Sequence, residues 1–302
     1  MMCKIKCTPA TSTKETNKRR KNAMRNKICA GIVTYNPSMS DVKKSIQQLS
    51  QQVHSIIIVD NASDNISDIE KIIQKNSQIT LIRNNQNKGI AAALNQIFVF
   101  AKNKGFHWVL TLDDDSEISD GYIEALYSKI DENVGIVCPI LEDRKTGRKF
   151  ESKTKKDTCI TSGSLTSIEA WTAVGGFDEW LFIDAVDFDF SKRIYRAGWR
   201  IEKNNNAILL HSIGDTEIKN LLFWQPAVRN HSVFRKYYQE RNYLYLDYKL
   251  NEYSYMKELL RFIKHCAIVI LWENEKRTKI QAMLKGRKDG LKKIRSMKMG
   301  EQ

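Results

Sequence analysis

Long uncharged apolar segments are missing from this sequence of 302 residues. The longest one near the C-terminus covers residues 266–272, whereas a membrane-spanning helix needs roughly 18 apolar residues. The first residues are basic, but no apolar segment follows them as it would in a secretory signal. We therefore expect a protein that is neither exported nor integral to a membrane.

Cysteine pairs and the common glycine-rich nucleotide motifs are missing as well. The six cysteines are scattered, without a CxxC pair, which argues against a structural zinc site and against a secreted disulfide framework. A reducing cytosol is the expected compartment. No GxxxxGK[ST] motif occurs, and no GxGxxG follows the first expected strand. A P-loop NTPase and a dinucleotide oxidoreductase are therefore disfavoured.

Acidic residues are scarce at the two ends of the chain. The formal net charge is +14, and residues 1–27 contribute +8 and residues 251–302 contribute +7, which leaves −1 for the middle. The basic ends keep a nucleic-acid-binding protein open as a competing class. The near-neutral middle argues against a basic groove through the globular part. With 42% hydrophobic residues the chain can form a core, so a mostly disordered protein is excluded.

Composition divides the chain into three parts. Residues 1–27 have almost no large apolar side chains and are expected to be a disordered basic tail. Residues 28–250 are expected to form one globular domain. Residues 251–302 combine a helical apolar pattern with dense basic residues and are expected to form a basic amphipathic helical extension.

Strand and helix patterns alternate at the start of the globular part. Short apolar runs at 28–34, 55–59, 79–83 and 108–112 predict buried strands. The segments between them, at 40–51, 67–76 and 90–104, predict helices. This order is typical of an α/β fold with a mostly parallel sheet and helices on both faces.

Polar clusters end three of these strands, at 34–36, 60–61 and 113–115. Each cluster alone is more often a turn than a site. The carboxyl ends of parallel strands meet at one edge of the sheet, where ligands bind in such folds. Together the clusters therefore predict a ligand site.

The triplet Asp113-Asp114-Asp115 is the most informative cluster. Three adjacent carboxylates repel one another, which favours a bound cation over the alternative, a solvated acidic loop. Alternation along a strand predicts that Asp113 and Asp115 project together while Asp114 points away. Two carboxylates with phosphate oxygens are suitable ligands for Mg²⁺ or Mn²⁺. The triplet thus favours a nucleotide-dependent transferase.

The ordered set of short motifs resembles glycosyltransferase family two, and within it bacterial rhamnosyltransferases. The resemblance covers about residues 28–248. It implies a Rossmann-like GT-A fold with a C-terminal helical extension, a sugar-nucleotide donor, a divalent metal and an inverting mechanism. The motifs are Thr34-Tyr35-Asn36-Pro37, Val59-Asp60-Asn61, Asn87-Lys88-Gly89-Ile90-Ala91, Leu112-Asp113-Asp114-Asp115-Ser116, Thr161-Ser162-Gly163, Gly175-Gly176-Phe177-Asp178-Glu179 and residues 181–187.

The resemblance implies particular donor contacts and metal ligands. Asp113 and Asp115 would hold the metal, with His211 as a third ligand; the alternative for His211 is a histidine that only ends a strand. A carboxylate can accept the imide N–H of uracil or thymine, and a tyrosine can offer its aromatic face. The implied donor-binding residues are Thr34, Tyr35, Asn36, Asp60, Lys88, Gly89, Asn95 and Asp114.

The second half of the site follows a glycine turn at 175–176. The family's base position falls on Asp187, which would take the proton of the acceptor hydroxyl. Asp184 and, less well, Asp189 are rivals, and acids in the first turn of a helix also have a purely structural explanation. Trp180 and Asp184 are tentative acceptor contacts.

Two C-terminal features keep alternatives open. Residues 235–243 interleave cations and aromatic rings, which is compatible with sugar or lipid-phosphate contacts, with helix packing, or with nucleic acid. The amphipathic pattern after residue 253 favours a helix lying on an anionic membrane surface. The alternative is a helix that packs on the core or forms a homo-oligomer.

These observations predict an inverting, metal-dependent glycosyltransferase. The first choice is transfer of L-rhamnose from dTDP-rhamnose to a bacterial surface polysaccharide or a lipid-linked oligosaccharide. The alternative is a galactofuranosyl- or hexosyltransferase with a UDP-sugar donor. The expected location is cytoplasmic, peripheral on the inner face of the membrane, with no nucleic-acid partner.

Overall fold

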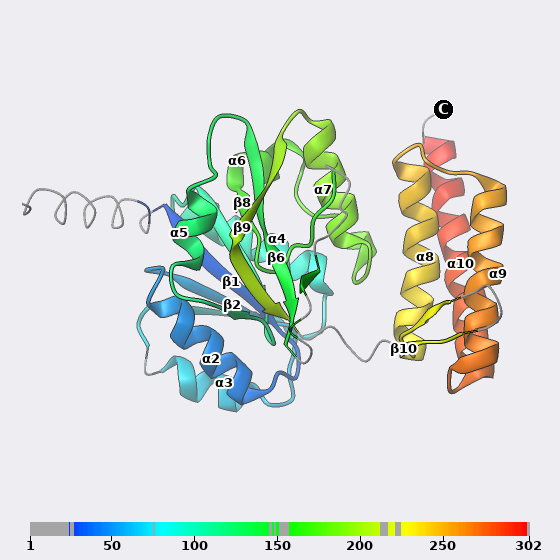
Figure 1. Ribbon diagram of the computed structural model, residues 1–302, viewed down its shortest axis with the longest axis horizontal. Coiled ribbons are helices and arrows are strands. Elements are labelled where there is room, and N and C mark those ends of the chain that lie inside the picture. The colour runs from blue at the N-terminus through cyan, green and yellow to red at the C-terminus, as the bar shows by residue number, and fades with distance from the viewer. Residues whose placement is uncertain are drawn as a thin grey trace, which may run out of the picture.

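The computed structural model describes residue 24 and residues 27–74, 76–144, 147, 149–150, 157–211, 217–220 and 225–300. Most of the expected tail, 1–27, lies outside these residues. A central sheet with the strand order β3-β2-β1-β4-β8-β6-β9-β5 forms the body of the molecule, and β7 pairs with β6 (Figure 1).

The first half of the sheet is parallel, as the alternating pattern predicts. Its elements are β1 (Ile28–Thr34), α2 (Met39–Ser50), β2 (Ile56–Asp60), α3 (Ile66–Ile73), β3 (Ile79–Arg83), α4 (Ile90–Asn103) and β4 (Trp108–Asp113). In the register, Thr34 pairs with Asp60 and Val33 pairs with Asp113. The polar clusters that follow β1, β2 and β4 therefore lie side by side at one sheet edge.

The second half of the sheet adds antiparallel strands. It consists of β5 (Glu117–Ile118), α5 (Tyr122–Tyr127), β6 (Val134–Asp143), β7 (Lys149–Phe150), β8 (Leu165–Ser167), α6 (Ile168–Ala173), the 3₁₀ helix η1 (Glu179–Leu181), α7 (Val186–Arg196) and β9 (Arg200–His211). Strand β8 runs antiparallel to both β4 and β6. The segment 157–165 thereby returns to the edge where β4 ends.

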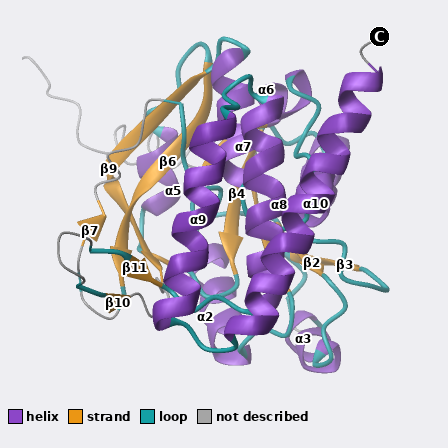
Figure 2. Ribbon diagram, turned by 90° about the vertical axis from the view of Figure 1, so that its right-hand side faces the viewer, coloured by secondary structure: helices purple, strands orange, loops and turns teal. Residues whose placement is uncertain are grey.

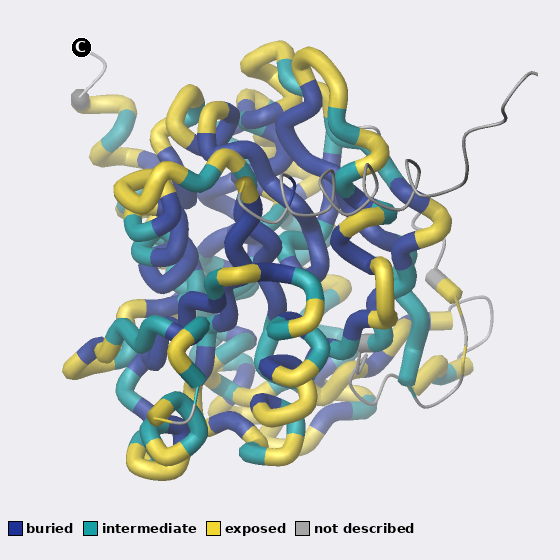
Figure 3. The backbone as a smooth tube through the Cα atoms, turned by 90° about the vertical axis from the view of Figure 1, so that its left-hand side faces the viewer, coloured by how far each residue is buried: buried dark blue, intermediate teal, exposed yellow. Residues whose placement is uncertain are grey.

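Apolar side chains fill both faces of the sheet. Alternate residues of β1 and β2 point to opposite faces, as the period of a strand requires. Cys29 and Ile57 pack with α4, α6 and α7, and Ile32 and Ile58 pack with α2 and α5. Figure 3 shows the buried backbone in the centre with exposed turns around it. The site edge is therefore held between two packed layers.

Three long helices form a layer of their own beside the sheet (Figures 1 and 2). They are α8 (Val233–Lys249), α9 (Tyr255–Trp272) and α10 (Lys276–Gly300), and the short pair β10 (Glu217–Ile218) and β11 (Ala227–Val228) lies near them. A Cβ on Gly286 would lie 2.2 Å from the carbonyl oxygen of Tyr237, so α10 approaches α8 very closely. This layer already begins with α8, before the expected extension at 251. Within the described residues, no helix has the length and apolarity to cross a bilayer.

Candidate active site

Asp60 organises the end of β1 and β2. Its Oδ1 accepts hydrogen bonds from Thr34 Oγ1 at 2.9 Å and from Ser63 Oγ at 2.5 Å, and its Oδ2 accepts from the backbone N–H of Ser63 at 2.9 Å. Asp60 and Thr34 are buried, whereas the Tyr35 ring is 54% exposed. Asn36 adopts a φ of 51° and turns the chain away from the sheet. The structure thus brings all four predicted residues together, with Tyr35 as the open surface.

Asn61 joins this turn to the loop before α4. Its amide donates to the carbonyl oxygen of Gly89 at 3.2 Å, and its Oδ1 accepts from Asn84 at 2.9 Å. Gly89 has a φ of +84°, and a Cβ there would lie 2.6 Å from Phe182. Glycine is therefore required both by the backbone and by the close approach of Phe182. Asn61 is the last residue of the motif Val59-Asp60-Asn61, but the motif did not predict it as a site residue.

The acidic triplet lies at the end of β4, beside the segment that β8 brings back. The Asp113 backbone N–H donates to Ser162 Oγ at 3.0 Å. Burial, followed by repulsion from Asp115 and Asp113, raises the pKa of Asp114 to about 7. Strand β4 ends at Asp113 and a turn follows, so strand alternation does not govern Asp114. Asp113 and Asp114 both line one cavity, and Asp115 is not among its lining residues, which differs from the expectation that Asp113 and Asp115 project together while Asp114 points away.

A cavity of about 620 Å³ lies between the two halves of the site. This volume is within the range of small-molecule pockets, and its lining mixes apolar and polar groups as such pockets do. Phe182 and Arg235, from the second half, lie across it from the sheet edge. Its lining residues are Val33, Tyr35, Asn61, Asn87, Gly89, Ile90, Asp113, Asp114, Phe182, Ile183, Phe234 and Arg235.

Asp187 stands in the first turn of α7, half-buried. Thr161 Oγ1 donates a hydrogen bond to its Oδ1. The pKa of Asp187 is raised to about 6, first by burial and then by the charges of Asp113 and Asp184, against the lowering effect of Thr161. These charges act on Asp187 because it lies near the acidic triplet. A carboxylate with this pKa suits a general base near neutral pH.

The two rivals of Asp187 are held in ion pairs. Asp184 binds Arg235 through both oxygens, at 2.5 and 3.3 Å. Asp189 is fully buried between Arg193 and Lys249, each 2.7 Å away. Their pairing leaves Asp187 as the carboxylate best placed to accept a proton.

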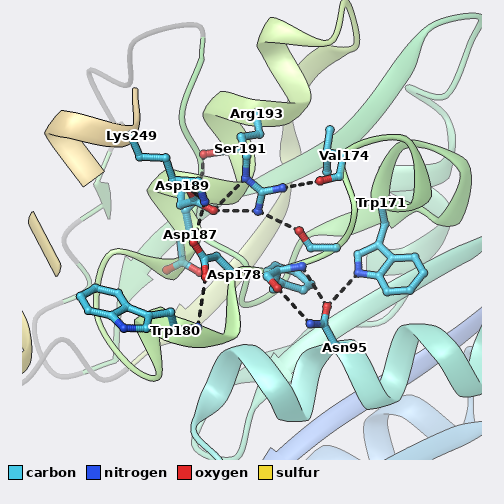
Figure 4. A network of polar contacts seen from close by, with 12 residues as sticks. Asn95, Trp171, Val174, Asp178, Trp180, Asp187, Asp189, Ser191, Arg193 and Lys249 are labelled. Carbon is cyan, nitrogen blue, oxygen red and sulfur yellow. Dashed lines mark hydrogen bonds and ion pairs between the residues drawn. The ribbon is translucent and has the colours of Figure 1, made fainter. Parts of the chain in front are cut away.

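A polar network fastens the glycine turn and η1 to their surroundings (Figure 4). Asn95 accepts from Trp171 Nε1 and the backbone N–H of Phe177, and donates to the Phe177 carbonyl oxygen and to Glu179. The side-chain amide of Asn95 is thereby fully used, which argues against its predicted contact with the donor. Sequence reasoning placed it on the correct helix but could not identify these partners.

Lys249 joins η1 and α7 to the helical layer. Its Nζ lies 2.7 Å from Asp178 Oδ2 and 2.7 Å from Asp189 Oδ1, and Figure 4 shows Lys249 beside Asp189. Trp180 also packs on this layer, with the Arg241 guanidinium 4.0 Å from its ring centre and Tyr245 at 4.5 Å. Trp180 therefore packs against α8, and its contact with the acceptor stays a prediction.

Arg241 and Asn242 of α8 hold the strained loop between η1 and α7. Phe182, Asp184 and Ala185 in this loop all have positive φ. The Asn242 amide donates to the carbonyl oxygens of Leu181, Ile183 and Asp184, and Arg241 donates to those of Trp180 and Leu181. Of the alternatives for 235–243, helix packing thus accounts for Arg241 and Asn242.

The predicted metal set is only partly described. His211 ends β9, where it pairs with Asp143 of β6, and its side chain lies outside the described part of the chain. Among the described residues, no three His, Cys, Asp or Glu side chains are grouped to hold a metal ion. The donor set nevertheless fits a hard cation, because the carboxylates of Asp113–Asp115 offer only oxygen ligands.

Comparison with protein families decides the class of this protein. The model of glycosyl transferase family 2 matches residues 29–196, more than half of the chain. The chain belongs to this family. The match runs from β1 to α7 and so includes both halves of the site. Membership confirms the predicted resemblance and favours an enzyme over the nucleic-acid-binding alternative.

A relative and two solved structures agree with this assignment. The glycosyltransferase is 28% identical over 299 residues to dTDP-rhamnosyl transferase RfbF of Shigella flexneri, covering 90% of this chain and 97% of that protein. It is also similar to TarS 1–349 of S. aureus in complex with UDP-GlcNAc (TM-score 0.54, 14% identity, 85% of this chain and 70% of that chain). GalNAc-T7 with UDP, GalNAc and Mn²⁺ has a TM-score of 0.54 at 15% identity.

The coverage of these matches sets what they support. The match with GalNAc-T7 covers 73% of this chain and 47% of the GalNAc-T7 chain. The structural similarities confirm the predicted α/β GT-A fold with a C-terminal helical region. The family match and the relative together make the chain a rhamnosyltransferase-like glycosyltransferase.

Proposed function

We propose that this glycosyltransferase moves L-rhamnose from dTDP-L-rhamnose to a hydroxyl group of a surface polysaccharide or a lipid-linked oligosaccharide, with inversion at the sugar. One observation carries the proposal: the 620 Å³ cavity runs between the Tyr35 turn and the acidic triplet, and Asp187 lies within electrostatic reach of that triplet. The similarity to a dTDP-rhamnosyl transferase supports this donor.

The sheet edge would bind the donor. Tyr35 offers an exposed ring for the base. Among the described residues, Asp60 Oδ2 accepts one hydrogen bond, from the backbone N–H of Ser63, so this oxygen can also accept the imide N–H of thymine. Lys88 and Gly89 would lie beneath the sugar nucleotide at the start of α4. Asn36 and Thr34 shape the same turn.

A divalent metal would be held by Asp113 and Asp115, with His211 as the further ligand. Bound there, Mg²⁺ or Mn²⁺ would neutralise the charge that develops on the departing diphosphate. Asp187 would take the proton of the acceptor hydroxyl while the new C–O bond forms and the bond from the sugar to the diphosphate breaks. The products are the glycoside and dTDP, and the proton resides on the Asp187 carboxylate.

A UDP-sugar donor is the second candidate. Two structures of the same fold are complexes with UDP or UDP-GlcNAc, and a pocket that accepts the imide N–H of thymine also accepts that of uracil. Galactofuranose and hexoses are the sugars to be compared. A nucleotide-release assay with dTDP-rhamnose, UDP-galactofuranose and UDP-glucose decides between them, because the preferred donor releases nucleotide fastest.

The helical layer would place the enzyme on the inner face of the membrane. One face of α9 exposes apolar side chains, and Lys257 and Lys264 flank it. Basic residues near an anionic surface contribute about 1 kcal/mol each, and α10 adds many. The exposed apolar residues are Met256, Leu260, Ile263, Ile270 and Leu271.

A further inference from the structure

A second cavity, of about 390 Å³, lies within the helical layer. Its walls are the segment after β11, one face of α8 and the inner face of α9. The lining is rich in cations and histidines and contains one acid. The lining residues are Ala227, Arg229, His231, Lys236, Gln239, Tyr243, Arg261, His265, Ile268 and Glu273. Among the described residues, none lines both this cavity and the one at the sheet edge.

The cations of this cavity are fixed in place. Lys236 is 9% exposed and lies 2.6 Å from Glu273. Arg261 pairs with Asp247 at 3.2 Å and with Glu258, and the Arg261 guanidinium lies 5.5 Å from the ring centre of Tyr243. These ion pairs fix the positions of Lys236 and Arg261 and offset part of their charge, while both side chains still line the cavity.

Several donors of the cavity remain available. Within the described part of the chain, neither Arg229 nor Gln239 has a hydrogen-bond or ion-pair partner, and the Tyr243 hydroxyl has no hydrogen-bond partner. Tyr243 keeps its proton, because burial, followed by Asp184 and Asp187, raises its pKa to about 12. Donors without acceptors beside fixed cations are the groups that bind an anion through charge-assisted hydrogen bonds.

Tyr243 links this cavity to the proposed base. Its ring centre lies 6.5 Å from that of Phe188, the residue next to Asp187. The pKa of the same tyrosine is raised by the charges of Asp184 and Asp187 and lowered by those of Arg261 and Arg229. His231, at the cavity, lies within electrostatic reach of both Arg235 and Asp184. Through the neighbouring rings of Tyr243 and Phe188, this cavity therefore lies near the proposed base.

We propose that this cationic cavity binds the phosphate or diphosphate group of the acceptor. The inference rests on the proposed function, and it names the acceptor class: a sugar that carries a phosphate ester near the hydroxyl to be glycosylated. Arg229 supplies a cation without an ion-pair partner among the described residues, and Gln239, Tyr243 and the paired Lys236 and Arg261 add N–H and O–H donors. Several donors around one unpaired cation suit a phosphate with several oxygens better than a single carboxylate. The apolar outer face of α9 lies next to it, where a lipid attached to that phosphate would reach the membrane.

The test is a calorimetric titration of the full-length protein in EDTA with saturating dTDP, so that the donor cavity is filled. The probes are inorganic diphosphate, farnesyl diphosphate and glucuronate. We expect Arg229→Gln to weaken binding of both diphosphates about tenfold or more, the effect of one charge-assisted hydrogen bond. The control Arg277→Gln, an exposed cation of α10 outside the cavity, removes the same charge and should bind like the wild type.

The outcomes separate the site from its alternatives. Farnesyl diphosphate binding that is tenfold tighter than inorganic diphosphate assigns the phosphate to a lipid, and equal affinities assign it to a water-soluble ester; both support the site. Equal weakening by the two variants, displacement by dTDP, or equally tight glucuronate binding overturns it. In a separate assay with Mn²⁺ in place of EDTA and without added dTDP, the wild type is tested for dTDP release from dTDP-rhamnose. If none is released while Arg229-dependent binding persists, the proposed function fails and the site stands.

Discussion

The backbone N–H of Ile90 donates to the carbonyl oxygen of Phe182 at 2.7 Å. This bond joins the first turn of α4, at the donor side of the cavity, to the loop that precedes Asp187. Asn242 holds the same loop from the opposite side through three carbonyl oxygens. The sugar-nucleotide site and the proposed catalytic base Asp187 are therefore coupled through one short loop. In this loop Phe182 and Asp184 have positive φ.

Gly89→Ala should reduce turnover more than the strain of a positive φ alone would. A Cβ would lie 2.6 Å from the Phe182 carbonyl oxygen, so the Ile90–Phe182 bond must lengthen or break. We expect turnover to fall on the order of 10²-fold, as for a misplaced reacting group. The control is Gly105→Ala, where φ is +78° but no atom lies within 4 Å. It should cost about 1–2 kcal/mol of stability and leave turnover unchanged; equal loss in both variants would contradict the coupling.

Asp187→Asn should reduce turnover by a factor on the order of 10²–10⁴ with little change in donor affinity. Asp189→Asn should instead lower the melting temperature, because it weakens a buried pair with Arg193 and Lys249. Steady-state kinetics and thermal unfolding of both variants distinguish the two roles. If Asp184→Asn is inactive while Asp187→Asn is tolerated, the base is Asp184.

The activity should rise with pH as Asp187 loses its proton. Its pKa is raised to about 6 and only the ionised form accepts a proton, so the rate increases from pH 5 to pH 7. The hydrogen bond from Thr161 lowers this pKa, so Thr161→Val should shift the rising limb to higher pH. A limb that stays in place, measured as turnover against pH at saturating donor, would exclude Asp187 as the titrating group.

Membrane binding should depend on the exposed face of α9. Replacing Leu260 and Ile263 together by serine should reduce co-sedimentation with anionic vesicles at low salt, since both side chains are more than half exposed. Val99→Ser, at an exposed apolar residue of α4, is the matched control and should bind like the wild type. If the double variant instead changes the molar mass measured by light scattering, the face joins two copies of the chain.

The strands and helices from 28 to 113 could be predicted to within three residues at each end, because short apolar runs and helical periods are local signals. The roles of Asn95 and Asn242 could not be predicted from the sequence. Asn95 meets Trp171 and Phe177 far along the chain, and a single asparagine carries no local sign of such partners. The orientation of Asp114 was missed because β4 ends one residue earlier and the turn that follows has no strand alternation.

Residues 235–243 illustrate the same limit. Their cations and rings were compatible with sugar or lipid-phosphate contacts, with helix packing or with nucleic acid, and in the structure individual residues have different roles. Arg241 supports the loop before Asp187, Arg235 pairs with Asp184, and Lys236 and Tyr243 line the cationic cavity. Which face of a helix meets which neighbour depends on long-range packing, which the spacing of residues alone does not contain.

The most direct test of the proposed donor and metal site is a calorimetric titration of dTDP into the wild type with Mn²⁺ and with excess EDTA. We predict that EDTA weakens dTDP binding about tenfold or more, about 1.4 kcal/mol, because a metal held by Asp113 and Asp115 would attract the diphosphate. Asp113→Ala and Asp115→Ala should each abolish this difference. Equal dTDP affinity with and without metal in the wild type would contradict the account.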